Sequence, residues 1–110
     1  MTLLSQHCKA DAPALSDEAA AALLPQVAGW AVIDGKLQSS FSFRNYYETI
    51  AFVNALAWVS HQQDHHPELV VSYKLCAVSY CTHSAGGDLS LNDFICAAKA
   101  SALYVQRAPA

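Results

Sequence analysis

The sequence carries little charge, since only 14% of its 110 residues are Asp, Glu, Lys or Arg. The six Lys and Arg residues are scattered along the chain, and the formal net charge is −3. Proteins that bind nucleic acids or anionic membranes gather basic side chains on one surface to neutralise phosphates. The composition therefore argues against direct binding of DNA, RNA or an anionic membrane.

Long hydrophobic runs are also lacking. The longest apolar stretches, such as 55–59 and 97–105, are bounded or interrupted by polar side chains and are far shorter than the roughly 20 residues of a membrane-spanning helix. Residues 1–10 contain no apolar signal-peptide core, and Lys9 follows the apolar residues instead of preceding them. We therefore expect no membrane span, no secretory signal and a cytoplasmic location.

The four cysteines, Cys8, Cys76, Cys81 and Cys96, show no CxxC spacing. Without an export signal, a reducing compartment is expected, and disulfides are rare there. We interpret all four as free thiols, and Cys76 and Cys96 as small buried apolar residues.

Only the start of the chain lacks a periodic pattern. We expect residues 1–14 to form a flexible N-terminal tail and residues 15–106 to form one domain, since 54% apolar content over this length is enough for a single core. No internal repeat or low-complexity tract follows Pro13.

The first half of the domain predicts a helix, a hairpin and a second helix. Ser16 precedes two acidic residues and an alanine-rich run, as expected at the start of a helix over 16–25. Alternating segments flank Asp34-Gly35, which is typical of a two-stranded hairpin. Asn45 is a plausible N-cap for a second helix that continues to about residue 63.

The second half predicts another hairpin and a third helix. Strands are expected at 69–73 and 76–83, with a loop at 84–88. Ser90 and Asp93 have the spacing of a capping box ahead of a helix that ends near residue 105. The order αββαββα predicts an α+β fold, a four-stranded antiparallel sheet with three helices packed on one face.

Three of the five histidines lie between residues 61 and 66, at the end of the expected second helix. A fourth, His83, lies near the end of the last expected strand, so we consider these four together. Imidazole titrates near neutral pH, so such a cluster suits proton transfer or metal binding. Strand alternation places His83 on the opposite side from Val78 and Tyr80, away from the helix-packed face. His83 should therefore be accessible.

Several separated motifs then resemble one family. The motifs are His65-His66-Pro67, Tyr73 six residues after that proline, Thr82-His83, and Leu89-Ser90 with Asp93. Together they resemble the signature of the pterin-4a-carbinolamine dehydratases. His61 stands four residues before His65, where the family pattern takes an acidic, basic or histidine residue. The likeness extends upstream through Gly29-Trp30 and covers about residues 15–102.

The resemblance implies a four-stranded antiparallel sheet with three helices, in agreement with the element order read above. It also implies a reaction, the loss of water from 4a-hydroxytetrahydropterin (4a-hydroxytetrahydrobiopterin) to give quinonoid dihydropterin. The substrate forms when an aromatic amino-acid hydroxylase uses tetrahydropterin and oxygen, so the role is to recycle the pterin. It implies no metal or other cofactor, a possible functional link to the hydroxylase, and a homo-oligomer, dimer or tetramer.

The same resemblance implies the site residues. His65, His66 and His83 are the expected catalytic histidines, and the division of acid and base roles among them stays open. Asp93 would support the site by orienting His83, although its capping-box position also explains it. His61, Tyr73 and Trp30 are expected as supporting or substrate-binding residues, with Trp30 and Tyr73 either flanking the pterin or serving as core.

Two other functions remain open. His61 and His65 at helical spacing, with Cys81 and His83 at strand spacing, could meet as zinc ligands, although no CxxC or HExxH motif supports this. Animal members of the family that the chain resembles also act as dimerisation partners of a homeodomain transcription factor, so a protein-interaction or coactivator module is the second alternative. An oligomer is expected in any case, because the sheet leaves two edges and one helix-free face.

Overall fold

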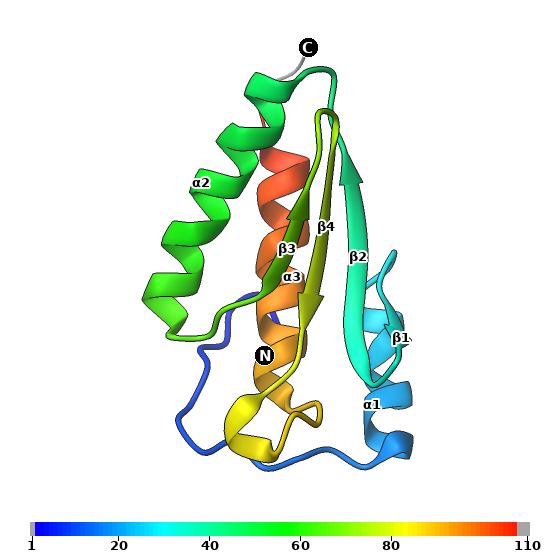
Figure 1. Cartoon of the computed structure of the whole chain (residues 1–110). Helices are drawn as coiled ribbons and strands as arrows, with labels where there is room; N and C mark the ends of the chain where they lie inside the picture. The colour runs from blue at the N-terminus through cyan, green and yellow to red at the C-terminus, as the bar shows by residue number, and fades with distance from the viewer. Residues whose placement is uncertain (1, 108–110) are drawn as a thin grey trace.

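The computed structural model describes residues 2–107 and has the expected α+β element order, with a 3-10 turn after α1 and another after β4 (Figure 1). The elements are α1 (Asp17–Leu23), η1 (Leu24–Gln26), β1 (Ala31–Ile33), β2 (Lys36–Ser42), α2 (Tyr46–Gln63), β3 (Glu68–Val71), β4 (Leu75–Tyr80), η2 (His83–Ala85) and α3 (Leu91–Gln106).

The four strands form one antiparallel sheet in the order β1-β2-β4-β3. The central pair joins the two predicted hairpins, with Leu37 opposite Tyr80 and Phe41 opposite Cys76. All four of these side chains are buried, so they lie on one face of the sheet. Helices α2 and α3 run beside each other and pack against that face, α2 on β4 and α3 on β2.

The predicted caps form. The Asn45 side chain accepts a hydrogen bond from the Glu48 amide at 2.8 Å, and Ser90 with Asp93 forms a complete capping box. Helix α1 ends at Leu23, two residues earlier than expected, because Pro25 falls within the tighter turn that follows. Strand β4 ends at Tyr80 instead of residue 83, and the Thr82 amide donates to the Asp88 carbonyl of the next loop.

The N-terminal segment differs from the expected free tail. Leu3 is buried, and the Lys99 ammonium donates to the Leu4 carbonyl at 2.8 Å. The described part of the segment therefore packs against α3, while the division of the chain at residue 14 stays a prediction. No helix within residues 2–107 has the length and apolar content to cross a membrane.

Candidate functional site

The end of α2, the start of η2 and the first turn of α3 meet around a cavity of about 540 Å³. Its lining residues include His65, His66 and His83. The volume lies within the usual range for small-molecule sites. All three of the expected catalytic residues therefore line one cavity.

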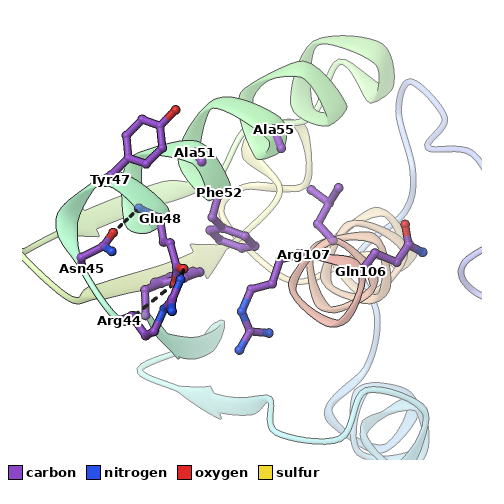
Figure 2. Close-up of a pocket in the computed structure, with 11 residues that line it drawn as sticks. Arg44, Asn45, Tyr47, Glu48, Ala51, Phe52, Ala55, Gln106 and Arg107 are labelled. Carbon is purple, nitrogen blue, oxygen red and sulfur yellow. Dashed lines mark hydrogen bonds and ion pairs between the residues drawn. The ribbon is translucent and has the colours of Figure 1, made fainter. Parts of the chain in front are cut away.

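A second hollow of similar size, about 570 Å³, lies between the first turns of α2 and the last turns of α3 (Figure 2). Phe52 and Leu103 line it, and its rim carries the ion pair between Arg44 and Glu48. Its lining contains no histidine or cysteine, so it offers no group that ordinarily titrates near neutral pH. We therefore place the candidate site at the histidine cavity.

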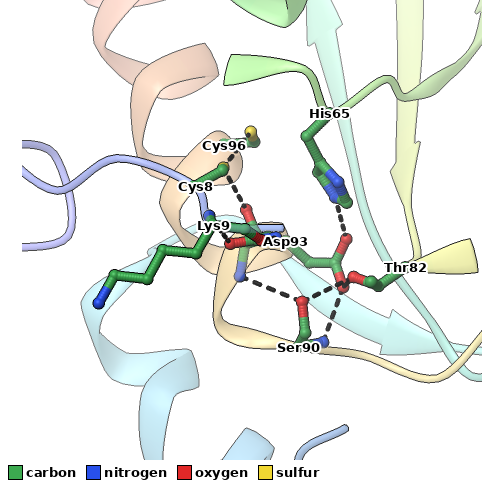
Figure 3. A network of polar contacts seen from close by, with 8 residues as sticks. Cys8, Lys9, His65, Thr82, Ser90, Asp93 and Cys96 are labelled. Atoms are coloured by element: carbon green, nitrogen blue, oxygen red, sulfur yellow. Dashed lines mark hydrogen bonds and ion pairs between the residues drawn. The ribbon is translucent and has the colours of Figure 1, made fainter. Parts of the chain in front are cut away.

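Asp93 is the centre of a buried polar network next to this cavity (Figure 3). Its Oδ1 lies 2.6 Å from Nε2 of His65, and its Oδ2 accepts hydrogen bonds from the Thr82 hydroxyl at 2.7 Å and the Ser90 amide at 2.9 Å. The carboxyl group is fully buried. A buried carboxylate is tolerated only when it is paired and hydrogen-bonded, and both of its oxygens are satisfied here.

The network changes the ionisation of His65. Burial by itself lowers the pKa of this imidazole, but the hydrogen bond and the charge of Asp93 outweigh burial and raise the pKa above its ordinary value of 6.5. The ring also stacks on Tyr80, with centroids 5.9 Å apart and planes 10° apart. His65 is thus held on two sides and favoured in its protonated form.

The backbone at the end of α2 explains why His65 turns inward. Asp64 adopts the left-handed conformation, with a φ of 49°, which Asp tolerates better than most residues. The Asp64 and His65 amides close the helix by donating to the carbonyls of His61 and Ser60. The chain then leaves the helix with His65 partly buried and His66 exposed.

His83 is exposed at the start of η2, whereas Val78, Tyr80 and Thr82 are buried. Its predicted accessibility is confirmed, although it lies just beyond the strand and not within it. Asp93, however, is bonded to His65 and not to His83, which the sequence had favoured as its partner. The reason is that the chain turns outward after Tyr80, which carries His83 toward solvent.

Three other expected site residues lie outside the cavity lining. His61 is exposed one turn earlier on α2, with its ring 5.7 Å from that of Trp58.

Trp30 is buried, packs on Phe41 and donates its ring N–H to Ser101 at 2.8 Å. Tyr73 is exposed at the turn between β3 and β4 and stacks on Tyr46. In this chain Trp30 is a core residue, and Tyr73 belongs to a surface aromatic pair.

The sequence did not predict that the N-terminal segment lines the cavity. Residues 8–11 form one wall, held by two amide side chains. The Cys8 amide donates to Gln63 Oε1 at 2.8 Å, the Lys9 amide donates to Asn92 Oδ1 at 3.0 Å, and Asn92 donates back to the Lys9 carbonyl at 2.8 Å. A segment without periodicity gives no signal for such contacts, because both partners are more than fifty residues away in sequence.

The zinc alternative receives no support from the geometry. Within residues 2–107, no three His, Cys, Asp or Glu side chains are grouped so that they could hold a metal ion. His61 points to solvent beside Trp58, so it does not join His65 and His83.

Comparison with known proteins agrees with the motifs. The family model described as pterin 4 alpha carbinolamine dehydratase matches residues 13–103. A protein of Nitrosomonas eutropha, named as a proposed pterin-4-alpha-carbinolamine dehydratase, is 54% identical over 99 residues, which cover 89% of this chain and 87% of the relative. A similarly named protein of Stenotrophomonas maltophilia is 55% identical over 94 residues, covering 84% of this chain and 80% of the relative.

A solved structure from Brucella melitensis, described as a transcriptional coactivator/pterin dehydratase, superposes with a TM-score of 0.78 at 26% identity. The match covers 83% of this chain and 98% of that one. Family model, relatives and fold agree over most of the chain, which therefore belongs to the pterin-4a-carbinolamine dehydratase family.

Proposed function

We propose that the chain is an enzyme, a hydro-lyase that converts 4a-hydroxytetrahydropterin to quinonoid dihydropterin and water by histidine acid/base chemistry. The observation that carries this proposal is the pairing of partly buried His65 with buried Asp93, at the edge of a cavity that two further, exposed histidines also line. Acid and base groups on one small cavity are what a dehydration needs.

In the proposed reaction, the lone pair of N5 helps to expel the hydroxyl group from C4a of the substrate. An acid must protonate the departing oxygen, and a base must accept a ring N–H proton. We assign the acid role to His65, because Asp93 favours its protonated form. With Nε2 held by Asp93, Nδ1 is the nitrogen left to donate the proton.

His83 and His66 are the candidates for the base. Both are exposed on the cavity, so either can exchange protons with solvent after each turnover. One proton leaves His65 with the water and one reaches the base, so the protein returns to its starting state by proton exchange alone. The proposed mechanism requires neither a metal ion nor an organic cofactor.

The test is the decay of the 4a-hydroxy compound, generated in place by an aromatic amino-acid hydroxylase and followed by absorbance. Addition of the protein should accelerate the decay in proportion to its concentration. His65→Ala protein should be much slower, whereas His61→Ala, which alters an exposed histidine outside the cavity lining, serves as the matched control. Decay no faster than in buffer alone would remove the proposal.

We also propose a homo-oligomer and a cytoplasmic role in recycling the pterin of a hydroxylase. The support for an oligomer is that helix α2 exposes large aromatic side chains, with Tyr47 83% and Trp58 62% exposed. Aromatic side chains are enriched in protein–protein interfaces relative to the rest of a protein surface. Light scattering at micromolar concentration should give a multiple of the 11.8 kDa chain mass, and a monomeric mass would contradict the oligomer.

A further inference from the structure

Cys8 and Cys96 lie against each other although they are 88 residues apart in sequence, with their sulfur atoms separated by 3.4 Å (Figure 3). Cys96 is buried on α3, one turn after Asp93. Cys8 is partly exposed in the irregular N-terminal segment and lines the histidine cavity. Cys8 is therefore the member of the pair that borders the cavity, and the Cys96 sulfur lies against the Cys8 sulfur.

The surroundings give the two thiols different reactivity. The hydrogen bond with Cys96 lowers the pKa of Cys8, burial opposes this, and the charges of His65 and Lys99 lower the pKa further against the opposing charge of Asp93. The same hydrogen bond, together with burial, raises the pKa of the Cys96 thiol. Thiolates are the reactive form of cysteine toward oxidants, so Cys8 is the cysteine that reacts with the oxidant. Cys96 is then the resolving cysteine, which attacks the oxidised Cys8.

We propose that Cys8 and Cys96 form a redox-active dithiol, a modification site that hydroperoxides convert to a disulfide bond. This inference concerns a chemistry separate from pterin dehydration. It needs only the two sulfurs and a hydroperoxide as the two-electron oxidant.

The steps balance as follows. The Cys8 thiolate attacks one peroxide oxygen, the O–O bond breaks, and Cys8 becomes a sulfenic acid while the other oxygen leaves as an alcohol or water after taking a proton from solvent. The Cys96 sulfur then attacks the Cys8 sulfur, and the S–O bond breaks. The departing hydroxide takes the Cys96 proton and leaves as water. The two sulfurs give up the two electrons that reduce the peroxide.

The movement required is small. A disulfide has its sulfurs about 2.05 Å apart, so the present separation of 3.4 Å must close by about 1.4 Å. Cys8 stands in an irregular segment, whereas Cys96 is fixed in α3. The N-terminal segment can therefore supply the movement, and the product ties this wall of the cavity to the helix that carries Asp93.

Oxidation with one equivalent of hydrogen peroxide, followed by acid quenching, alkylation and peptide mapping, tests the site. We expect the peptides that contain Cys8 and Cys96 to be linked and to have lost two hydrogen atoms, with Cys76 and Cys81 still alkylated. A dithiol reductant should restore all four free thiols. The linked protein should also have a higher Tm than the reduced protein, because a cross-link across this many residues restricts the unfolded chain.

Three variants separate the roles. Cys8→Ala should form no link, and Cys96→Ala should stop at a Cys8 sulfenic acid that a cyclic 1,3-diketone traps. Cys81→Ala is the matched control, since Cys81 is another partly exposed cysteine of the same cavity, and this variant should still form the link. A link from Cys8 to Cys81, a link only between two chains, or full alkylation of Cys8 and Cys96 after peroxide would overturn the proposal. Peptide mapping uses no pterin, so its outcome is independent of the proposed dehydratase activity.

Discussion

The side-chain carboxylate of Asp93 both caps helix α3 and binds His65. Its Oδ2 accepts a hydrogen bond from the Ser90 amide at 2.9 Å, and its Oδ1 lies 2.6 Å from His65 Nε2. The residue that fixes where α3 begins is therefore also the one that fixes the imidazole. A capping box needs only the first contact, so the second makes Asp93 a positioning residue for the proposed chemistry.

Replacing Asp93 by Asn tests this double role. The amide keeps the shape and can still accept the Ser90 hydrogen bond, but it removes the negative charge that favours protonated His65. We expect the dehydration rate to fall by about a hundredfold or more, as for loss of a general acid. Far-ultraviolet circular dichroism should remain that of a folded protein, while the loss of a charged hydrogen-bond partner costs about 1–3 kcal/mol of stability.

The pH profile of the same variant separates positioning from a purely structural role. In the unmodified chain the activity should fall as pH rises through the raised pKa of His65. In Asp93→Asn this fall should move to lower pH, because burial then acts without the opposing carboxylate. An unchanged profile with reduced rate would mean that Asp93 acts only as a helix cap.

Stability should follow pH with a definite sign. The pKa of His65 is raised on folding, so its contribution is fully present below its unfolded value of about 6.5 and is lost as pH rises through the folded pKa. The difference in Tm between Cys8→Ser protein and the double variant Cys8→Ser/His65→Gln should therefore be larger at pH 6 than at pH 9. Both proteins should carry Cys8→Ser, because Cys8 also titrates beside His65. A Tm difference that grows toward alkaline pH would contradict this.

Sequence patterns predicted the elements of this fold because each depends on neighbours in the chain. The Asn45 cap, the Asp34-Gly35 hairpin and the Ser90–Asp93 capping box all involve residues within a few positions of one another. The motif resemblance also gathered His65, His66 and His83, which do share a cavity.

The contacts that define the site were less predictable. The Asp93–His65 bond spans 28 residues, and the contact of Cys8 with Cys96 spans 88. Such pairs depend on how helices and strands pack, which local periodicity does not encode. The role of Trp30 was also left open by the sequence, because aromatic residues suit both the wall of a ligand-binding site and a hydrophobic core.

Metal removal provides an independent check on the mechanism. The proposed leaving group is activated by protonation, whereas a metalloenzyme would activate it by Lewis-acid contact. Activity should therefore survive prolonged dialysis of the protein against a strong chelator, measured with 4a-hydroxy substrate that the hydroxylase has already formed. The substrate must be generated before the protein is added, because the hydroxylase can itself need metal. Activity that is lost on dialysis and restored by zinc would favour the metal-binding alternative.

The histidines are best tested as a set. Replacement of His65, His66 or His83 by Ala should each slow dehydration, by about a hundred- to ten-thousandfold where the acid or base is removed. His61→Ala should have little effect, because His61 is not one of the residues that line the cavity and its exposed ring lies beside Trp58. Only His65→Ala should also lower the Tm, since His65 packs between Asp93 and Tyr80, whereas His66 and His83 are exposed. Rates that fall in His61→Ala alone would place the active site elsewhere on the molecule.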